Sequence, residues 1–290
     1  MKRKLKLLLK ILLTAAALAF VLQKVEPDRL KSALRSADAF WLFCAFFFFN
    51  LSKIASALRL NLYFETIGLH LAQSYNLLLY YVGMFYNLFL PGGIGGDGYK
   101  IYLLNKTFKQ RLKTLFQAVL LDRVSGLAAL IFYAALLCAF SRYAQLYPLT
   151  YGAAILCALL VFPATYLMTK LFFPLFLDVF GKTMAWGLAV QLLQLVSAWM
   201  IAKSLGIDGA LWEYMTLFLV SSVAAVLPLT IGGVGIRELT FLYGLEWIGE
   251  NPALGVTFSF LFFMVTALSS LAGLFLINRI QAQPIDKEVI

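Results

Sequence analysis

Two glycine-rich segments carry the residues best suited to chemistry in this 290-residue chain. They read Pro91-Gly92-Gly93-Ile94-Gly95-Gly96-Asp97-Gly98-Tyr99-Lys100 and Pro228-Leu229-Thr230-Ile231-Gly232-Gly233-Val234-Gly235-Ile236-Arg237. Both fit one gap-free pattern, Pro-x-x-Ile-Gly-Gly-x-Gly followed by an apolar or aromatic residue and then Lys or Arg. Pro and Gly let a helix unwind, and amide N–H groups at a helix start favour an anion. The pattern predicts an anion site that includes the amides of Gly95, Gly96, Gly232, Gly233 and Gly235.

One basic side chain lies deep inside an apolar run. Arg123 stands about ten residues, or roughly 15 Å, beyond Lys113, which places it near the middle of a bilayer. An arginine at that depth is costly and is expected to face the protein interior at a functional site. Asp122 precedes it on the helix and points elsewhere, so Asp97 or a substrate phosphate is the expected counter-charge. The alternative is a structural ion pair that holds a hairpin in place.

Further charged residues lie within one turn of the points where the two helices restart. Lys100 belongs either to the binding site or to the solvated basic cluster that continues to Lys113. Arg237 and Glu238 stand alone on a side with few charges, so we expect a phosphate clamp or a mutual gate there. Asp97 has a second interpretation as a helix N-cap.

The composition excludes a water-soluble domain. Hydrophobic residues make up 62% of the chain, charged residues 13%, and the mean hydropathy is +0.86. The net charge is +10, and the charged residues lie between apolar runs. They therefore indicate how the chain threads the membrane and an attraction to anionic lipid, rather than binding of nucleic acid. One histidine and three cysteines show no metal-ligand spacing, so we predict no metal, no cofactor and no catalytic residue.

Eight apolar runs approach or exceed the length that crosses a bilayer. They cover residues 7–22, 39–58, 71–90, 115–140, 151–168, 184–202, 211–229 and 253–277. The first run has an alternative interpretation as a cleaved signal peptide, because basic residues precede it and Ala-Leu-Ala at 17–19 resembles a cleavage site. Segment 25–37 predicts a helix that lies on the membrane surface. Lys53 and Arg59 are expected to snorkel to the inner interface.

The distribution of basic residues predicts how these runs thread the membrane. If the third and seventh runs are re-entrant hairpins, 16 of the 24 Lys and Arg residues lie inside, compared with 11 when all eight runs cross. The predicted fold is therefore an all-α polytopic membrane protein with six full crossings and two re-entrant glycine-rich hairpins. Both termini are predicted to be cytoplasmic, in a multi-pass protein of the cytoplasmic membrane.

The two motifs also predict an internal repeat within a single membrane domain, 1–290. Repeat one covers about 7–145, repeat two about 146–279, and 280–290 forms a cytoplasmic tail. Each half has an odd number of crossings, so the second is inverted relative to the first. Inverted repeats with broken helices are typical of secondary transporters, whose substrate binds near the midplane.

Three stretches together resemble the flippase-like membrane domain of the lysylphosphatidylglycerol synthase family. They are 87–100, with N-x-x-x-P-G-x-I-G-G-D, 121–127, with D-R-x-x-G-L, and 231–238. The resemblance covers about residues 6–279 and brings Asn87 and Asp122 into the candidate substrate-binding set. It implies movement of an aminoacylated or otherwise modified lipid across the cytoplasmic membrane. Larger members carry a soluble synthase domain that these 290 residues lack, so lipid aminoacylation is not implied.

The leading hypothesis is a flippase for an anionic or modified phospholipid or a lipid-linked headgroup, bound between the two hairpins. A second hypothesis is an intramembrane transferase that acts on a lipid-linked donor, with Asp97 or Asp122 as the base. A third is a non-catalytic membrane subunit that recruits a separate synthase or glycosyltransferase. Whether the chain oligomerises stays open.

Overall fold

The computed structural model describes residues 35–89, 94–226 and 235–282. Within these ranges the chain forms helices and short connections, without a β-strand. The predicted first crossing, nearly all of the predicted surface helix 25–37 and most of the tail lie outside the described residues.

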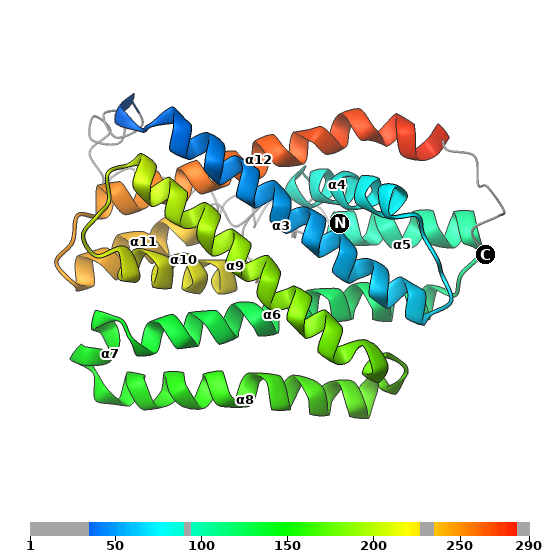
Figure 1. Cartoon of the computed structure of the whole chain (residues 1–290), viewed down its shortest axis with the longest axis horizontal. Helices are drawn as coiled ribbons and strands as arrows, with labels where there is room; N and C mark the ends of the chain where they lie inside the picture. Colours follow the sequence, from blue (N-terminus) through cyan, green and yellow to red (C-terminus); the bar gives the residue numbers. More distant parts are fainter. Residues whose placement is uncertain (1–34, 90–93, 227–234, 283–290) are drawn as a thin grey trace, which may run out of the picture.

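Five helical stretches of the described chain are long and apolar enough to cross a membrane. They comprise α3 (Ala39–Thr66), α6 (Leu112–Ala139), α8 (Pro148–Phe172), α9 (Phe180–Ser204) with the preceding 3-10 turn η1 (Pro174–Val179), and α12 (Pro252–Ala282). A short helix, α7 (Arg142–Leu146), turns the chain from α6 to α8 (Figure 1). These stretches coincide with the full crossings predicted after the first run, and the chain is a multi-pass membrane protein.

The first glycine-rich segment joins two helices that form an antiparallel hairpin. In this first hairpin α4 (Gln73–Phe89) precedes the motif and α5 (Gly95–Phe108) follows it. The rings of Tyr86 and Tyr99 lie 4.5 Å apart near the break, and those of Tyr75 and Phe108 lie 6.2 Å apart at the far ends. The chain therefore reverses its direction between the two helices.

The second glycine-rich segment lies in an equivalent hairpin. This second hairpin consists of α10 (Leu211–Val226) and α11 (Ile236–Trp247). Arg237 donates a hydrogen bond to Ser222 near the break at 3.1 Å, and the rings of Tyr214 and Phe241 lie 6.0 Å apart further along. With 17 residues in α4 and 16 in α10, neither leading helix is as long as the five crossing stretches.

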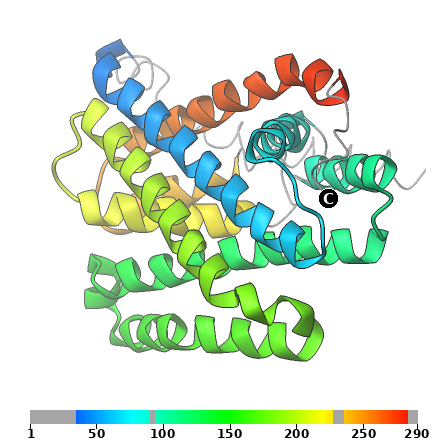
Figure 2. The same cartoon turned by 45° about the vertical axis from the view of Figure 1, so that its right-hand side comes forward.

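Helices α3 and α9 pack side by side and run in opposite directions (Figures 1 and 2). The start of α3 meets the end of α9, where the amide of Asp38 donates to the carbonyl of Ser204 at 2.9 Å. The first hairpin packs mainly on α12 through α4, and the second packs on α12 through α11 and on α6 through α10. Because α4 follows the end of α3 and α10 follows the end of α9, the two hairpins extend from opposite ends of the bundle.

Candidate functional site

Asp97 is the centre of a charge cluster at the start of α5. Its side chain is buried and accepts hydrogen bonds from Lys100 Nζ, at 3.3 Å, and from Arg123 Nε on α6. Asp97 was one of the two counter-charges expected for Arg123, and the structure shows this ion pair. It lies in the first turn of α5, where a carboxylate also interacts favourably with the helix dipole.

Lys100 is a buried residue rather than part of a solvated face. It is 4% exposed, and its Nζ lies 4.5 Å from the centre of the Tyr80 ring on α4. Its side chain also fills the space beside Gly83, where a Cβ would lie 2.5 Å from Lys100 Cε. The interpretation of Lys100 as a member of the solvated basic cluster is therefore wrong, because the hairpin folds it back against α4.

Asp122 has a partner that sequence reasoning missed. Arg59 on α3 donates through Nε to Asp122 Oδ1 at 2.8 Å, and both residues are buried. The guanidinium lies beside Gly126 and Gly187, which leave room for it because they lack side chains. The prediction that Arg59 snorkels to the interface is wrong, since this ion pair and close helix packing hold it inside.

The spacing of polar residues along α3 contained a signal for this burial. Ser52, Ser56 and Arg59 fall on one face of the helix, and all three are buried. Two consecutive residues of α6, Asp122 and Arg123, therefore reach α3 and the first hairpin respectively. This arrangement ties the first hairpin to the central helices.

Asn87 closes the first hairpin at its break. Its Oδ1 accepts a hydrogen bond from the Gly96 amide at 2.8 Å, so this amide has a protein partner. Gly96 also packs so tightly that a Cβ on it would lie 1.9 Å from the Gly83 carbonyl oxygen. Gly95 is the first residue of α5. In this structure Asn87 and Gly96 serve to shape the hairpin, and a substrate role for them stays a prediction.

The charged pair of the second hairpin has separate partners. Glu238 is buried and accepts hydrogen bonds from the Gly235 amide at 2.6 Å and from Ser259 Oγ at 3.0 Å. The Arg237 guanidinium donates to Ser222 and lies 5.3 Å from the centre of the Phe262 ring. The two side chains therefore form no ion pair with each other in the described structure, and a mutual gate stays a prediction. Glu238 caps α11, whereas Arg237 as a phosphate clamp stays a prediction.

Two of the predicted anion-binding glycines, Gly232 and Gly233, lie outside the described residues. Gly235 is described and has a φ of +91°, a left-handed conformation that glycine adopts readily. Among the described residues, no group of His, Cys, Asp and Glu has the arrangement of a metal site.

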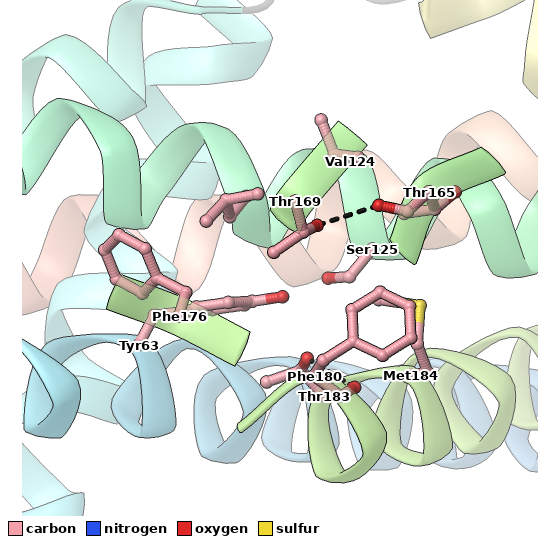
Figure 3. A pocket seen from close by; sticks show the side chains of 10 residues that line it. Tyr63, Val124, Ser125, Thr165, Thr169, Phe176, Phe180, Thr183 and Met184 are labelled. Carbon is pink, nitrogen blue, oxygen red and sulfur yellow. Dashed lines mark hydrogen bonds between the residues drawn. The ribbon is translucent and has the colours of Figure 1, made fainter. Parts of the chain in front are cut away.

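A hydroxyl-lined pocket lies between α3, α6, α8 and α9, and none of its lining residues is charged (Figure 3). Tyr63, Ser125, Thr165, Thr169 and Thr183 contribute its hydroxyl groups. Its empty space of about 200 Å³ is divided among the side chains and leaves no opening for a water molecule. This pocket is therefore a packing feature and no headgroup site.

Residues 7–273 match the family model described as the lysylphosphatidylglycerol synthase TM region. The chain belongs to this family. The match covers both hairpins, four of the five crossing stretches in full and α12 as far as residue 273, so the resemblance seen in the glycine motifs extends over nearly the whole bundle. Membership in the lysylphosphatidylglycerol synthase TM family associates the chain with membrane phospholipids. No curated protein matches the sequence.

Proposed function

We propose that the protein moves an anionic or modified phospholipid, or a lipid-linked headgroup, across the cytoplasmic membrane. The headgroup binds between the two hairpins while the acyl chains stay in lipid. Family membership supports a role with membrane lipid, and the paired hairpins support the transport step.

The contact between Arg123 and Asp97 is the observation that carries this proposal. The Arg123 side chain is 37% exposed, whereas that of Asp97 is 8% exposed. A guanidinium carries five N–H donors in a planar fork that matches a phosphate, so a partly exposed arginine is suited to bind one. Arg123 is therefore the residue on which we expect the headgroup to bind.

The helix packing supports an inverted repeat. Matching the two motifs pairs α3 with α9, α4 with α10, α5 with α11 and α6 with α12. If each helix is replaced by its counterpart, the contact between α4 and α12 corresponds to a contact between α10 and α6. Both contacts occur in the structure. The hairpins also extend from opposite ends, as a half-turn about an axis in the membrane plane requires.

The basic residues support a cytoplasmic location for one end of the bundle. Lys106, Lys109, Arg111 and Lys113 lie where α5 passes into α6, and Lys170 and Lys182 lie where α8 passes into α9. Arg279 lies in the last turn of α12 at the same end (Figure 1). The positive-inside rule assigns this end to the cytoplasm, which puts the C-terminus there. The same threading predicts a cytoplasmic N-terminus.

The test uses the full chain in vesicles that contain fluorescent phosphatidylglycerol, with a membrane-impermeant quencher outside. We expect wild-type protein to expose label from the inner leaflet to the quencher. Arg123→Ala is expected to slow this exchange about tenfold or more, the equivalent of one lost charge-assisted hydrogen bond. Lys182→Ala removes one exposed charge away from the hairpins and is expected to leave the rate unchanged. Equal rates for wild type, Arg123→Ala and protein-free vesicles would refute the proposal.

The transferase hypothesis gains no support from the two aspartates. Asp97 and Asp122 already accept hydrogen bonds from cations, so neither presents a free carboxylate as a base. Turnover of a lipid-linked donor without lipid movement, abolished by Asp97→Asn, would reverse this conclusion. Recovery of a soluble synthase or glycosyltransferase with the purified chain would favour the recruiting-subunit hypothesis.

A further inference from the structure

Lys53 and Arg237 are two half-buried cations that flank one aromatic pair. Lys53 Nζ lies 4.3 Å from the centre of the Phe49 ring, and Arg237 Cζ lies 5.3 Å from that of Phe262. The two rings pack edge to face with their centres 5.7 Å apart. The cations therefore approach the same region from α3 and α11, one from each of the two matched halves.

Neither cation is neutralised by a carboxylate in the described part of the chain. Across residues 35–89, 94–226 and 235–282 no ion pair involves Lys53 or Arg237, and the Arg237 hydrogen bond goes to the neutral hydroxyl of Ser222. Glu238 follows Arg237 in the sequence, but its carboxylate accepts hydrogen bonds from the Gly235 amide and from Ser259. Aromatic faces attract cations but carry no net charge, so among the described residues neither cation has a carboxylate in direct contact.

The charged residues near the starts of α5 and α11 and in the middle of α3 and α6 leave a positive excess. The cations are Lys53, Arg59, Lys100, Arg123 and Arg237, and the carboxylates are Asp97, Asp122 and Glu238. Segments 90–93 and 227–234, which join the helices of each hairpin, contain no ionisable side chain in the sequence. Among these groups the cations therefore exceed the carboxylates by two.

A third cation, Arg59, is only partly hydrogen-bonded. Arg59 Nη1 is buried and has no hydrogen-bond partner among the described residues, although Arg59 Nε is paired with Asp122. Positive charges without a carboxylate in contact are costly away from water, so an anionic ligand that contacts Lys53 and Arg237 lowers this cost.

We infer that the site takes a lipid headgroup with about two negative charges, a phosphate monoester or a diphosphate, and that Lys53 and Arg237 bind the second charge. This inference rests on the proposed function and defines its substrate class. Lysylphosphatidylglycerol has two ammonium groups and one phosphate, so its net positive charge is opposed by the positive site. A singly charged phosphodiester leaves one positive charge without a partner.

The experiment measures binding to the full chain in a neutral detergent by titration calorimetry. The probes are farnesyl diphosphate, dioctanoyl phosphatidic acid and dioctanoyl phosphatidylglycerol, with lysylphosphatidylglycerol as the cationic comparison. We expect farnesyl diphosphate and phosphatidic acid, which each carry more than one negative charge, to bind about tenfold more tightly than phosphatidylglycerol, as one added charge-assisted contact provides. Lysylphosphatidylglycerol is expected to bind most weakly.

Variants of Lys53 test whether this residue produces the preference for the more highly charged probes over phosphatidylglycerol. Lys53→Met and Lys53→Gln are expected to remove most of the tenfold preference while changing phosphatidylglycerol affinity little. The matched control Lys182→Met removes an exposed charge and is expected to retain the preference. Two substitutions at position 53 are used, and gel filtration selects the folded one.

The outcomes separate this inference from the proposed function. Equal affinity for all three anionic probes, with translocation of phosphatidylglycerol intact, would overturn the inference and leave the proposed function standing. A full preference in both Lys53 variants would overturn the role of Lys53. Absence of binding by any probe, together with absence of translocation, would overturn both.

Discussion

Gly96 of α5 lies directly against the backbone of Gly83 in α4. A Cβ on Gly96 would approach the Gly83 carbonyl oxygen to 1.9 Å, a separation that backbone atoms cannot relieve without moving the helices apart. The first hairpin therefore depends on two glycines facing each other, and the charge cluster of Asp97 and Lys100 depends on the hairpin.

This contact predicts a difference between two glycines of one motif. Gly96→Ala is expected to separate α4 from α5 and to abolish lipid movement, with a lower melting temperature in detergent. Gly98→Ala is the matched control, because a Cβ at Gly98 meets no atom within 4 Å. Equal melting temperatures and equal activities for the two variants would contradict this packing.

The buried ion pair between Arg59 and Asp122 predicts a large loss of stability when one partner is neutralised. Asp122→Asn leaves a buried guanidinium without its counter-charge, which destabilises a protein by about 3–5 kcal/mol. Thermal unfolding in detergent measures the change. The double variant Arg59→Met with Asp122→Leu removes both charges and is expected to recover much of the loss. A single variant that is as stable as wild type would show that the pair is not formed.

Glu238 is predicted to stabilise the start of α11. Glu238→Ala removes the acceptor for the Gly235 amide and for Ser259, which we expect to cost about 1–3 kcal/mol of unfolding free energy. Glu238→Gln keeps one acceptor oxygen and is expected to lose less. Hydrogen exchange of the amides at the start of α11 measures the effect locally, and unchanged exchange in Glu238→Ala would contradict the capping role.

Tyr143 in the turn helix α7 predicts a dependence of stability on high pH. Burial and the nearby Glu213 raise the pKa of the Tyr143 hydroxyl, which donates to the Gly244 carbonyl at 2.8 Å. A raised pKa means that the folded state favours the protonated form, so this stabilisation is complete below about pH 10 and is lost as pH rises further. The melting temperature of wild type is expected to fall above this pH more steeply than that of Tyr143→Phe. Parallel curves would refute the contribution.

Sequence reasoning predicted the parts of the fold that depend on length and apolarity. The crossings at α3, α6, α8, α9 and α12 correspond to uninterrupted apolar runs, and hydrocarbon allows few other arrangements for them. Repeated glycines and prolines showed where two helices break. The pairing of Arg123 with Asp97 was also accessible, because a deep arginine requires a nearby anion.

Sequence reasoning failed where side-chain direction decides the environment. From their positions in the sequence alone, Lys100 and Arg59 resemble basic residues at the membrane interface. They are buried only because α4 packs against Lys100 and α6 packs against Arg59. The adjacency of Arg237 and Glu238 suggested a pair, yet Glu238 satisfies the Gly235 amide three residues earlier. Such choices depend on helix rotation, which a single run of residues does not specify.

The most direct test of the account is a structure of the full chain with a bound anionic lipid. The account predicts that the lipid phosphate lies between the two hairpins within hydrogen-bond distance of the Arg123 guanidinium, with the acyl chains in the surrounding membrane. A well-ordered lipid bound only on the outer faces of the bundle, with the space beside Arg123 filled by protein side chains, would contradict it.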